Sequence, residues 1–530
     1  MTGDLGRRQC SPEVTGDGGH ARAETGEIML AIVFAAAGAL NMPCAELKNI
    51  ELERATITSA VDVAAGLFKP ANAPANPTAQ SGPPPQPIPQ HCRVTLVLKP
   101  TPDSNINVEL WLPTENWNGK FLAVGNGGWA GSIQGYGDMQ AALRRGYATA
   151  ATDTGHSAAD GPGGMFALGH PEKIVDFAYR ALHDMTVKSK RLIDVFYAEP
   201  LDYSYYKGCS TGGRQGVMAA QRYPGDYDGI IAGALANRHI HMHTAGSYRS
   251  IELARNPDEA LSEAKAKLVN DAVMKQCDTL GEGFLNNPRQ CSFDVDTLAC
   301  PAGKSSDSCL TPAELKTVNT FYEGLHTSDG KLVFSGQNIG NPIPALPSKL
   351  EGPGENLTDS IKILGFQDAD YDWRQFDLDR DLPIIDAATG FVDAVDPDLR
   401  AFKAQGGKLL LYAGWRDTGI TPENTVLYYE SVRAEMGGDR DASAGERDQA
   451  DWMRLFMVPG MGHCRGGPGV DTFDTLAALE QWRERAVAPA EMPATGRESG
   501  LARPVCAYPA YAKYDGSGDL KDAANWSCVK

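Results

Sequence analysis

Short apolar runs alternate with longer amphipathic segments along most of this chain. A run of about four to eight apolar residues between turn residues predicts a buried strand, and apolar residues at helical spacing predict a helix. Helical spacing occurs over 177–196, 215–222 and 472–485. The predicted strands are 94–98, 107–112, 121–124, 148–152, 203–206, 229–232, 408–413 and 454–458. Strands that alternate with helices predict a mainly parallel sheet covered on both faces, an α/β fold.

The pattern changes between about 237 and 400. Four cysteines fall close together there, among many Asp, Asn, Gly and Pro residues and with little strand alternation. A chain of 530 residues is longer than one core usually organises, so an inserted domain is expected. We divide the chain into a leader, a first part of the core, an inserted lid domain and a second part of the core, at 1–42, 43–236, 237–400 and 401–530.

The N-terminal region has the features of an export signal. The apolar run 28–40 is too short to span a bilayer but suits a secretory signal, with a buried helix as the alternative. A proline-rich tether follows at 70–89. Cys10 precedes the apolar run, which leaves ten of the eleven cysteines downstream, an even number typical of disulfides in exported proteins. These features predict a secreted or periplasmic protein without a membrane span.

Charge narrows the range of partners. The chain carries 49 basic and 67 acidic residues, a net charge of −18, which argues against binding nucleic acid or anionic membranes. The sequence gives no indication of the oligomeric state.

The strongest chemical signal is Gly208-Cys209-Ser210-Thr211-Gly212, between the predicted strand 203–206 and the predicted helix 215–222. G-x-S-x-G at a strand-to-helix turn is a nucleophile elbow. It lifts the serine hydroxyl out of the sheet and points the first N–H groups of the helix at the group that the serine attacks. The motif alone is a weak signal in a glycine-rich sequence. Cys209 before the serine and Cys464 directly after a histidine strengthen it.

A serine nucleophile needs a base and an orienting carboxylate, which follow in the order Ser, Asp, His in proteins with this elbow. Asp417 follows the strand 408–413 and His463 follows the strand 454–458, so both are expected at the carboxyl edge of the sheet beside Ser210. An ordinary turn aspartate is the alternative for Asp417. If Ser210 meets His463, their neighbours Cys209 and Cys464 come close enough for a disulfide, with two free thiols as the alternative.

A glycine-rich loop after the strand 121–124 suits the second oxyanion donor. Gly128 N–H, together with Thr211 N–H, is expected to hold the developing oxyanion. A plain glycine loop is the alternative, but the spacing is not that of a dinucleotide-binding fingerprint.

Other candidate residues carry weaker signals. The triplet His239, His241 and His243 suggests a metal site only by its spacing, and no cysteine pair has zinc spacing. His156 is interpreted as structural or pocket-lining. Four aromatic residues are candidate contacts for a substrate ring, although core packing is the expected role of each: Trp129, Phe366, Trp373 and Trp415.

The motifs at 208–214, 414–417 and 459–468, with the C-terminal cysteine segments at 503–506 and 525–528, resemble the tannase and feruloyl esterase family over most of the chain. The resemblance implies an α/β-hydrolase core with a lid at 237–400 and a triad of Ser210, Asp417 and His463. It also implies the disulfides Cys209–Cys464, Cys44–Cys92, Cys277–Cys291, Cys300–Cys309 and Cys506–Cys528.

The family lid usually binds calcium through aspartates between two cysteines, and here the sequence departs from the pattern. The loop after Cys277 is shorter by about three residues and lacks the central aspartate, whereas calcium prefers six to eight oxygen ligands. Asp278 and Glu282 remain as candidate ligands, so structural calcium is doubtful, and no cofactor is required for the chemistry.

These observations predict a serine esterase that hydrolyses small esters of feruloyl-type or galloyl-type aromatic acids through an acyl-enzyme. A hydrolase of mono(2-hydroxyethyl) terephthalate type is one alternative. A non-catalytic protein that binds polyphenols or glycans on a hydrolase scaffold is another, although the complete Ser, Asp and His set argues against it.

Overall fold

The computed structural model describes residues 42–68, 86–348, 352, 358–437 and 450–530. Nearly all of the predicted leader, including the apolar run 28–40 and Cys10, lies outside these residues, as does most of the proline-rich segment 70–89. The described residues from 42 onward belong to one compact unit.

The core is a nine-stranded sheet with the order β1-β2-β3-β5-β4-β6-β7-β10-β11. Strands β1, β2, β3 and β5 pair antiparallel, whereas β5, β4, β6, β7, β10 and β11 run parallel. All eight predicted strands are present, and the predicted α/β fold is confirmed. The strands are β1 (Ala55–Val63), β2 (His91–Leu98), β3 (Ile106–Pro113), β4 (Lys120–Val124), β5 (Ala148–Thr152), β6 (Tyr203–Cys209), β7 (Gly229–Gly233), β10 (Lys408–Gly414) and β11 (Met453–Val458).

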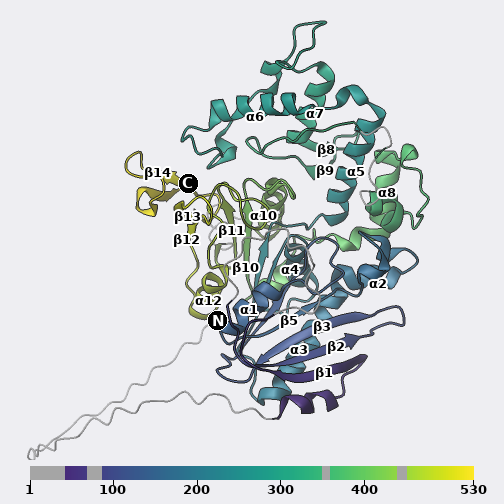
Figure 1. Ribbon diagram of the computed structural model, residues 1–530, viewed down its shortest axis with the longest axis vertical. Helices are drawn as coiled ribbons and strands as arrows, with labels where there is room; N and C mark the ends of the chain where they lie inside the picture. The colour runs from purple at the N-terminus through teal and green to yellow at the C-terminus, as the bar shows by residue number, and fades with distance from the viewer. Residues whose placement is uncertain (1–41, 69–85, 349–351, 353–357, 438–449) are drawn as a thin grey trace, which may run out of the picture. The chain divides into compact units, whose positions relative to one another are not determined.

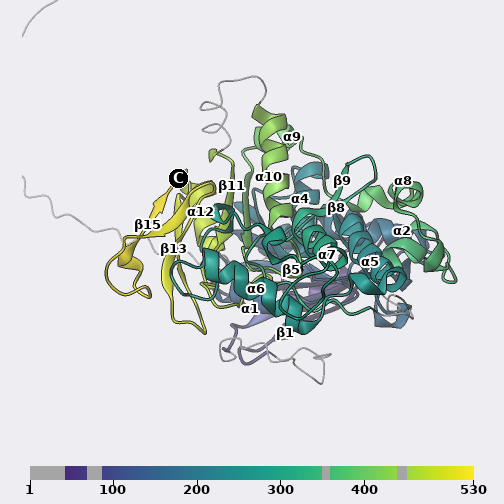
Figure 2. The same ribbon diagram turned by 90° about the horizontal axis from the view of Figure 1, so that it is seen from above.

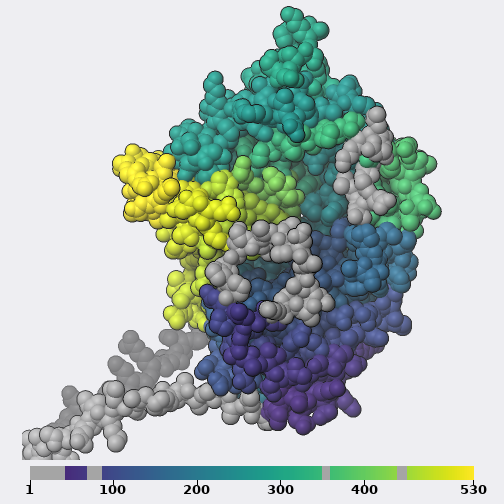
Figure 3. Space-filling model, in the orientation of Figure 1, coloured from purple at the N-terminus to yellow at the C-terminus, as the bar shows by residue number. Residues whose placement is uncertain are grey.

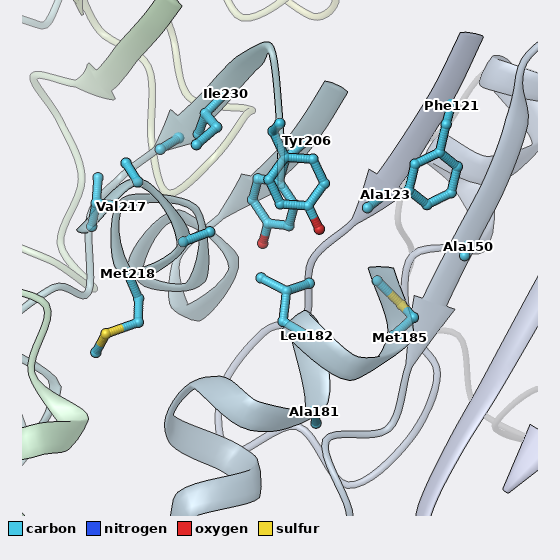
Figure 4. Packing of buried hydrophobic residues seen from close by; sticks show 14 of the residues in the cluster. Phe121, Ala123, Ala150, Ala181, Leu182, Met185, Tyr206, Val217, Met218 and Ile230 are labelled. Carbon is cyan, nitrogen blue, oxygen red and sulfur yellow. The ribbon is translucent and has the colours of Figure 1, made fainter. Parts of the chain in front are cut away.

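Helices cover both faces of the sheet because successive side chains of a strand point to opposite faces. In β10, Leu409 and Leu411 pack on one side with α3 (Ala181–Tyr197), α4 (Thr211–Arg222) and α10 (Pro422–Gly437). Leu410 packs on the other side with α1 (Tyr136–Arg144) and α12 (Thr475–Arg485). Burial on both faces explains the unbroken apolar run in this strand. Figure 4 shows part of the first cluster, with Leu182 and Met185 of α3 near Tyr206 of β6.

The predicted helix over 177–196 has an irregular beginning. The short helix α2 (Pro171–Val175) leads into a π-helical turn over Asp176–Arg180, and only then does the regular helix α3 begin.

In the segment between β7 and β10, where the sequence predicts a lid, none of the described residues joins the main sheet. This segment contributes to two hydrophobic clusters. One cluster lies entirely within the segment, and the other also contains Phe166 and Phe177 of the core. Figures 1 and 2 agree in placing α5, α6 and α7 together at one end of the core. The lid elements are α5 (His239–Arg255), α6 (Glu263–Cys277), α7 (Pro312–Glu323), β8 (Gly324–His326), β9 (Leu332–Ser335) and α8 (Leu378–Thr389), after which α9 (Arg400–Ala404) leads to β10.

The C-terminal segment forms two hairpins beside the lid. They are β12 (Glu491–Thr495) with β13 (Ala502–Cys506), and β14 (Tyr511–Tyr514) with β15 (Trp526–Val529). Arg289 of the lid donates a hydrogen bond to the hydroxyl of Tyr508 at 2.7 Å. Figure 3 shows the yellow C-terminal residues against the teal lid. Among the described residues, no helix is both long enough and apolar enough to cross a bilayer.

Candidate active site

Ser210 lies on a tight turn between β6 and α4. Its backbone has φ 66° and ψ −125°, a conformation that non-glycine residues adopt only where the surroundings hold them in it. Here Ser210 N–H donates to Gly233 C=O at 3.0 Å, and Gly212 N–H donates to Asn126 C=O at 2.8 Å. A side chain at Gly208 would approach Gly212 C=O to 2.5 Å, which explains the glycine of the motif. The predicted elbow is therefore present.

The glycine-rich loop after β4 lies against this turn. Thr211 hydroxyl donates to Gly128 C=O at 2.6 Å, so the two predicted oxyanion donors belong to neighbouring residues. Thr211 is the first residue of α4, where backbone N–H groups have no partner within the helix. Gly128 is exposed and has φ +57°, and the loop begins with Asn126, which exchanges hydrogen bonds with Gln215 of α4. The loop is thus fixed to the same helix that carries the elbow.

The predicted base and carboxylate are paired. His463 Nδ1 lies 2.8 Å from Asp417 Oδ2, and Asp417 Oδ1 accepts hydrogen bonds from Gly419 N–H at 2.8 Å and Ile420 N–H at 2.9 Å. The Asp417 side chain is 1% exposed, whereas that of His463 is 39% exposed. Since an ionised carboxylate only accepts hydrogen bonds, His463 Nδ1 carries the proton and Nε2 is left as an acceptor. This is the tautomer that a general base requires.

A disulfide joins the two loops that carry Ser210 and His463. Cys209 and Cys464 are bonded, with a Cα–Cα distance of 6.0 Å. The bridge ties the residue before the serine to the residue after the histidine, so the two catalytic candidates lie on adjoining loops. The predicted bridge is confirmed, as are the four other pairings that the resemblance implied.

The histidine triplet does not form one cluster. On α5, residues four apart share a face and residues two apart do not. His241 pairs with Asp386 Oδ1 at 2.7 Å and with Val333 C=O at 3.1 Å. His239 and His243 instead contact the ring of Trp129. Among the described residues, no group of three His, Cys, Asp or Glu side chains is arranged to hold a metal ion.

Two further residues fix the site: Arg214, for which the sequence analysis predicted no role, and His156, which it interpreted as structural or pocket-lining. Arg214, in the first turn of α4, is fully buried and donates to the carbonyl groups of Phe177, Ala178 and Val392. It therefore ties the elbow helix to the chain that leaves the lid. His156 Nε2 lies 2.6 Å from Trp129 C=O and braces the oxyanion loop. The sequence signals were Arg214, two residues after Gly212 of the elbow motif, and His156, four residues after the end of β5.

Of the candidate aromatic contacts, Trp129 lies nearest in sequence to the predicted oxyanion donors. Trp415 is 5% exposed and belongs to the core of the sheet. Phe366 and Trp373 pack on the hydrophobic cluster shared with the lid.

The residues proposed for calcium do not fit that ion. The Asp278 carboxylate accepts hydrogen bonds from the N–H groups of Glu282 and Gly283. The Glu282 carboxylate accepts both terminal nitrogens of Arg503, which is fully buried and lies 3.8 Å from the centre of the Trp526 ring. Both carboxylates are thus engaged, and one of them by a fixed cation, whereas calcium needs several free oxygen ligands.

A cavity of about 760 Å³ lies elsewhere, between α1, α12 and the β12–β13 hairpin. Ser210, Asp417 and His463 are not among its lining residues. A well-formed concave cavity is a default candidate for a binding site. Here the geometry of the elbow, base and carboxylate outweighs that default, because the cavity is without a paired nucleophile and base.

Comparison with known proteins agrees with the site. Residues 92–352 and 354–529 match the family described as tannase and feruloyl esterase. The chain is 35% identical to an uncharacterized esterase of Xanthomonas campestris, covering 92% of this chain and 91% of that protein. It is 32% identical to feruloyl esterase B of Aspergillus niger, covering 83% and 86%. The crystal structure of feruloyl esterase B from Aspergillus oryzae superposes with a TM-score of 0.78 at 30% identity, covering 92% and 99%. These likenesses support the α/β-hydrolase fold that the motifs implied.

Proposed function

This chain belongs to the tannase and feruloyl esterase family and is a carboxylic ester hydrolase, and we propose that it hydrolyses esters of aromatic acids through Ser210, His463 and Asp417. The observation that carries the proposal is the 2.8 Å contact between His463 Nδ1 and Asp417 Oδ2, on a loop that a disulfide ties to the residue before Ser210. A buried carboxylate that orients a half-exposed imidazole beside a serine elbow is the arrangement of a serine hydrolase.

In the first half of the reaction, His463 Nε2 takes the proton of Ser210 Oγ while Oγ bonds to the ester carbonyl carbon. The carbonyl π electrons move to the oxygen and form a tetrahedral oxyanion. Asp417 holds the imidazole in position and stabilises the imidazolium, and it keeps its own charge. The intermediate then expels the alcohol oxygen, which takes the proton from His463 Nε2 and leaves an acyl-serine.

The oxyanion is stabilised by the N–H groups of Thr211 and Gly128. Support comes from the position of Thr211 at the start of α4 and from its 2.6 Å hydrogen bond to Gly128 C=O. Preorganised donors of this kind typically contribute about 100- to 1,000-fold each to turnover. In the second half, water gives a proton to His463 Nε2 while its oxygen bonds to the acyl carbon, which forms a second tetrahedral oxyanion between the same donors. This intermediate breaks its bond to Ser210 Oγ, which takes the proton back from His463, and the acid is released.

For the acid we propose a feruloyl-type or galloyl-type group. Support comes from the feruloyl esterase B proteins at 30–32% identity, whose lengths this chain covers by 86% or more. A release assay with methyl ferulate, methyl gallate, chlorogenate and a terephthalate monoester ranks the acids. If the enzyme instead prefers the terephthalate monoester, the feruloyl-type or galloyl-type assignment is wrong, but the proposed esterase chemistry is unaffected.

The five disulfides support maturation in an oxidising compartment, so we propose that the protein is secreted or periplasmic. Fractionation of the producing cell, with activity assayed in each fraction, tests this.

Ser210→Ala tests the nucleophile. We expect hydrolysis of p-nitrophenyl acetate and methyl ferulate to be lost, with an unchanged circular dichroism spectrum and melting temperature. Thr421→Ala, a buried hydroxyl that pairs with Ser335 at 2.5 Å, is a matched control that keeps its activity. Residual turnover of the alanine variant above about a thousandth of wild type would point to another nucleophile. Binding of a phenolic ester without hydrolysis by the wild type would favour a non-catalytic binding protein.

A further inference from the structure

A group of aromatic rings lies directly beside the oxyanion loop. The ring of Trp129, the residue after Gly128, has its centroid 4.7 Å from the ring of His239 and 4.7 Å from the ring of His243. Phe177 closes one side, at 5.7 Å from Trp129 and 5.4 Å from His239. His243 is stacked on Trp129 with an interplanar angle of 28°, and His239 meets it edge-on at 89°.

Two imidazoles in this group have hydrogen-bonding capacity that the described residues do not use. His239 is 0% exposed, and neither of its ring nitrogens has a partner among the described side chains and backbone. The half-buried ring of His243 likewise forms no hydrogen bond with the part of the chain that the structure describes. A buried polar group left without a partner destabilises a protein by about 1–3 kcal/mol. Such groups in a native fold therefore call for a functional explanation.

Both imidazoles are neutral near pH 7. Burial, together with the proximity of His243 and of the Arg214 guanidinium, holds the pKa of His239 well below its usual value. Burial alone lowers the pKa of His243 to about 4. A neutral imidazole presents one donor and one acceptor, which matches a hydroxyl group, itself both donor and acceptor.

The two segments that carry these rings both start at the elbow. Ala236 N–H donates to Ser210 C=O at 3.3 Å, and α5 begins three residues later at His239. On the other side, Gly128 C=O accepts the hydroxyl of Thr211 at 2.6 Å, and Trp129 follows. An acyl group attached to Ser210, with its oxyanion between Thr211 and Gly128, is thus flanked by the chain that leads to His239 and by the chain that leads to Trp129.

We infer that Trp129 and His243 form the subsite for the ring of the acid, with the enclosed His239 in contact with both of their rings, and that the His243 imidazole recognises a phenolic hydroxyl on the acid. The inference rests on the proposed esterase function. Trp129 supplies a flat apolar surface, and an offset aromatic stack contributes about 0.5–1.5 kcal/mol beyond its buried area. His243 distinguishes a hydroxylated ring from a plain one, because an unhydroxylated ring leaves its nitrogens unpaired.

The test compares two esters that differ in ring hydroxylation, methyl ferulate and methyl cinnamate. His243→Phe keeps a stacked ring but removes both nitrogens. We expect kcat/KM for methyl ferulate to fall about 10- to 100-fold, since a site built to bind a hydroxyl discriminates through unpaired polar groups. For methyl cinnamate we expect a change of less than about threefold. His243→Gln, which keeps a donor and an acceptor, should recover part of the loss on methyl ferulate.

His170→Phe is the matched control, because His170 is an exposed histidine that pairs with Asp103 at 2.6 Å. Inhibition constants for free ferulic and cinnamic acid, measured against p-nitrophenyl acetate, give a second reading. In the His243→Phe variant only the ferulic acid constant should rise. Equal losses on both esters, or none, would overturn the subsite and leave the esterase assignment intact. Failure of the esterase assignment would instead appear as wild-type protein that hydrolyses neither p-nitrophenyl acetate nor methyl ferulate.

Discussion

Replacing Asp417 by Asn should prevent His463 from acting as a general base, although the His463 imidazole itself is unchanged. Asp417 Oδ1 accepts from two backbone N–H groups, at 2.8 and 2.9 Å, and Oδ2 faces His463 Nδ1. An amide has only one accepting atom, and its oxygen will face the two backbone donors because the NH₂ group cannot accept from them. The NH₂ group then faces Nδ1, which must become the acceptor. The proton of His463 moves to Nε2, where it blocks uptake of the Ser210 proton.

The expected loss in kcat is about 10,000-fold, or about 5 kcal/mol of transition-state stabilisation. The opposite amide orientation is unfavourable, because it leaves two buried N–H groups unsatisfied at about 1–3 kcal/mol each. Saturating p-nitrophenyl acetate measures kcat, and the melting temperature confirms folding.

Asp153→Asn is the control for this variant. Asp153 also accepts two backbone N–H groups on Oδ1, but its Oδ2 partner is the side-chain amide of Asn107, which can turn around. We expect this control to keep kcat within a few-fold of wild type. If Asp417→Asn retained more than about a tenth of wild-type turnover, Asp417 would not set the tautomer of His463.

Four further predictions concern activity, stability and cofactor independence. The double variant Cys209→Ala, Cys464→Ala lacks a bridge with a sequence separation of 255, which stabilises the fold by about 5 kcal/mol through chain entropy. This variant should lose activity at temperatures where it is still folded, because the base is no longer held in place. Full activity in the folded double variant would contradict this prediction. Arg503→Met leaves the buried Glu282 carboxylate unpaired and should lower the free energy of unfolding by about 3–5 kcal/mol. A chelator should leave the wild-type melting temperature unchanged, and one tightly held calcium per chain by elemental analysis would refute that view. Burial lowers the pKa of His156 to about 4, so as the pH falls below 6.5 the unfolded chain takes up this proton before the folded chain does. The free energy of unfolding in urea should therefore decline between pH 6.5 and 4, and less steeply in His156→Asn.

The central sheet was predictable because its strands are buried on both faces. The run 408–413 has no polar face, and the structure places its leucines against helices on either side. The strand β1 was missed because its sequence mixes polar and apolar residues and half of it is exposed. The hairpin β12–β13 was missed because each of its strands contains a proline and lies outside the main sheet.

The arrangement of Ser210, Asp417 and His463 on neighbouring loops was predictable because each residue follows a strand of one sheet, and the ends of parallel strands meet at one edge. Contacts between segments far apart in the chain left no local signal. The pairing of Glu282 with Arg503 spans 221 positions, and nothing around either residue indicates the other. The alternation of His239, His241 and His243 resembled a metal motif, but the helical period turns the middle residue toward Asp386. The helix geometry, and not the sequence spacing, separates the role of His241 from the roles of His239 and His243.

The order in which the cysteines are synthesised has a consequence for how the enzyme matures. Among the described cysteines, four bridges join neighbours in the sequence, whereas Cys209–Cys464 encloses two of them. A chain that is oxidised as it emerges from its N-terminus meets the cysteines of the lid long before Cys464. Cys209 must stay reduced through that interval, or be released from a wrong partner by thiol exchange. Production should therefore depend on a disulfide isomerase, and activity should be the last property that the new chain acquires.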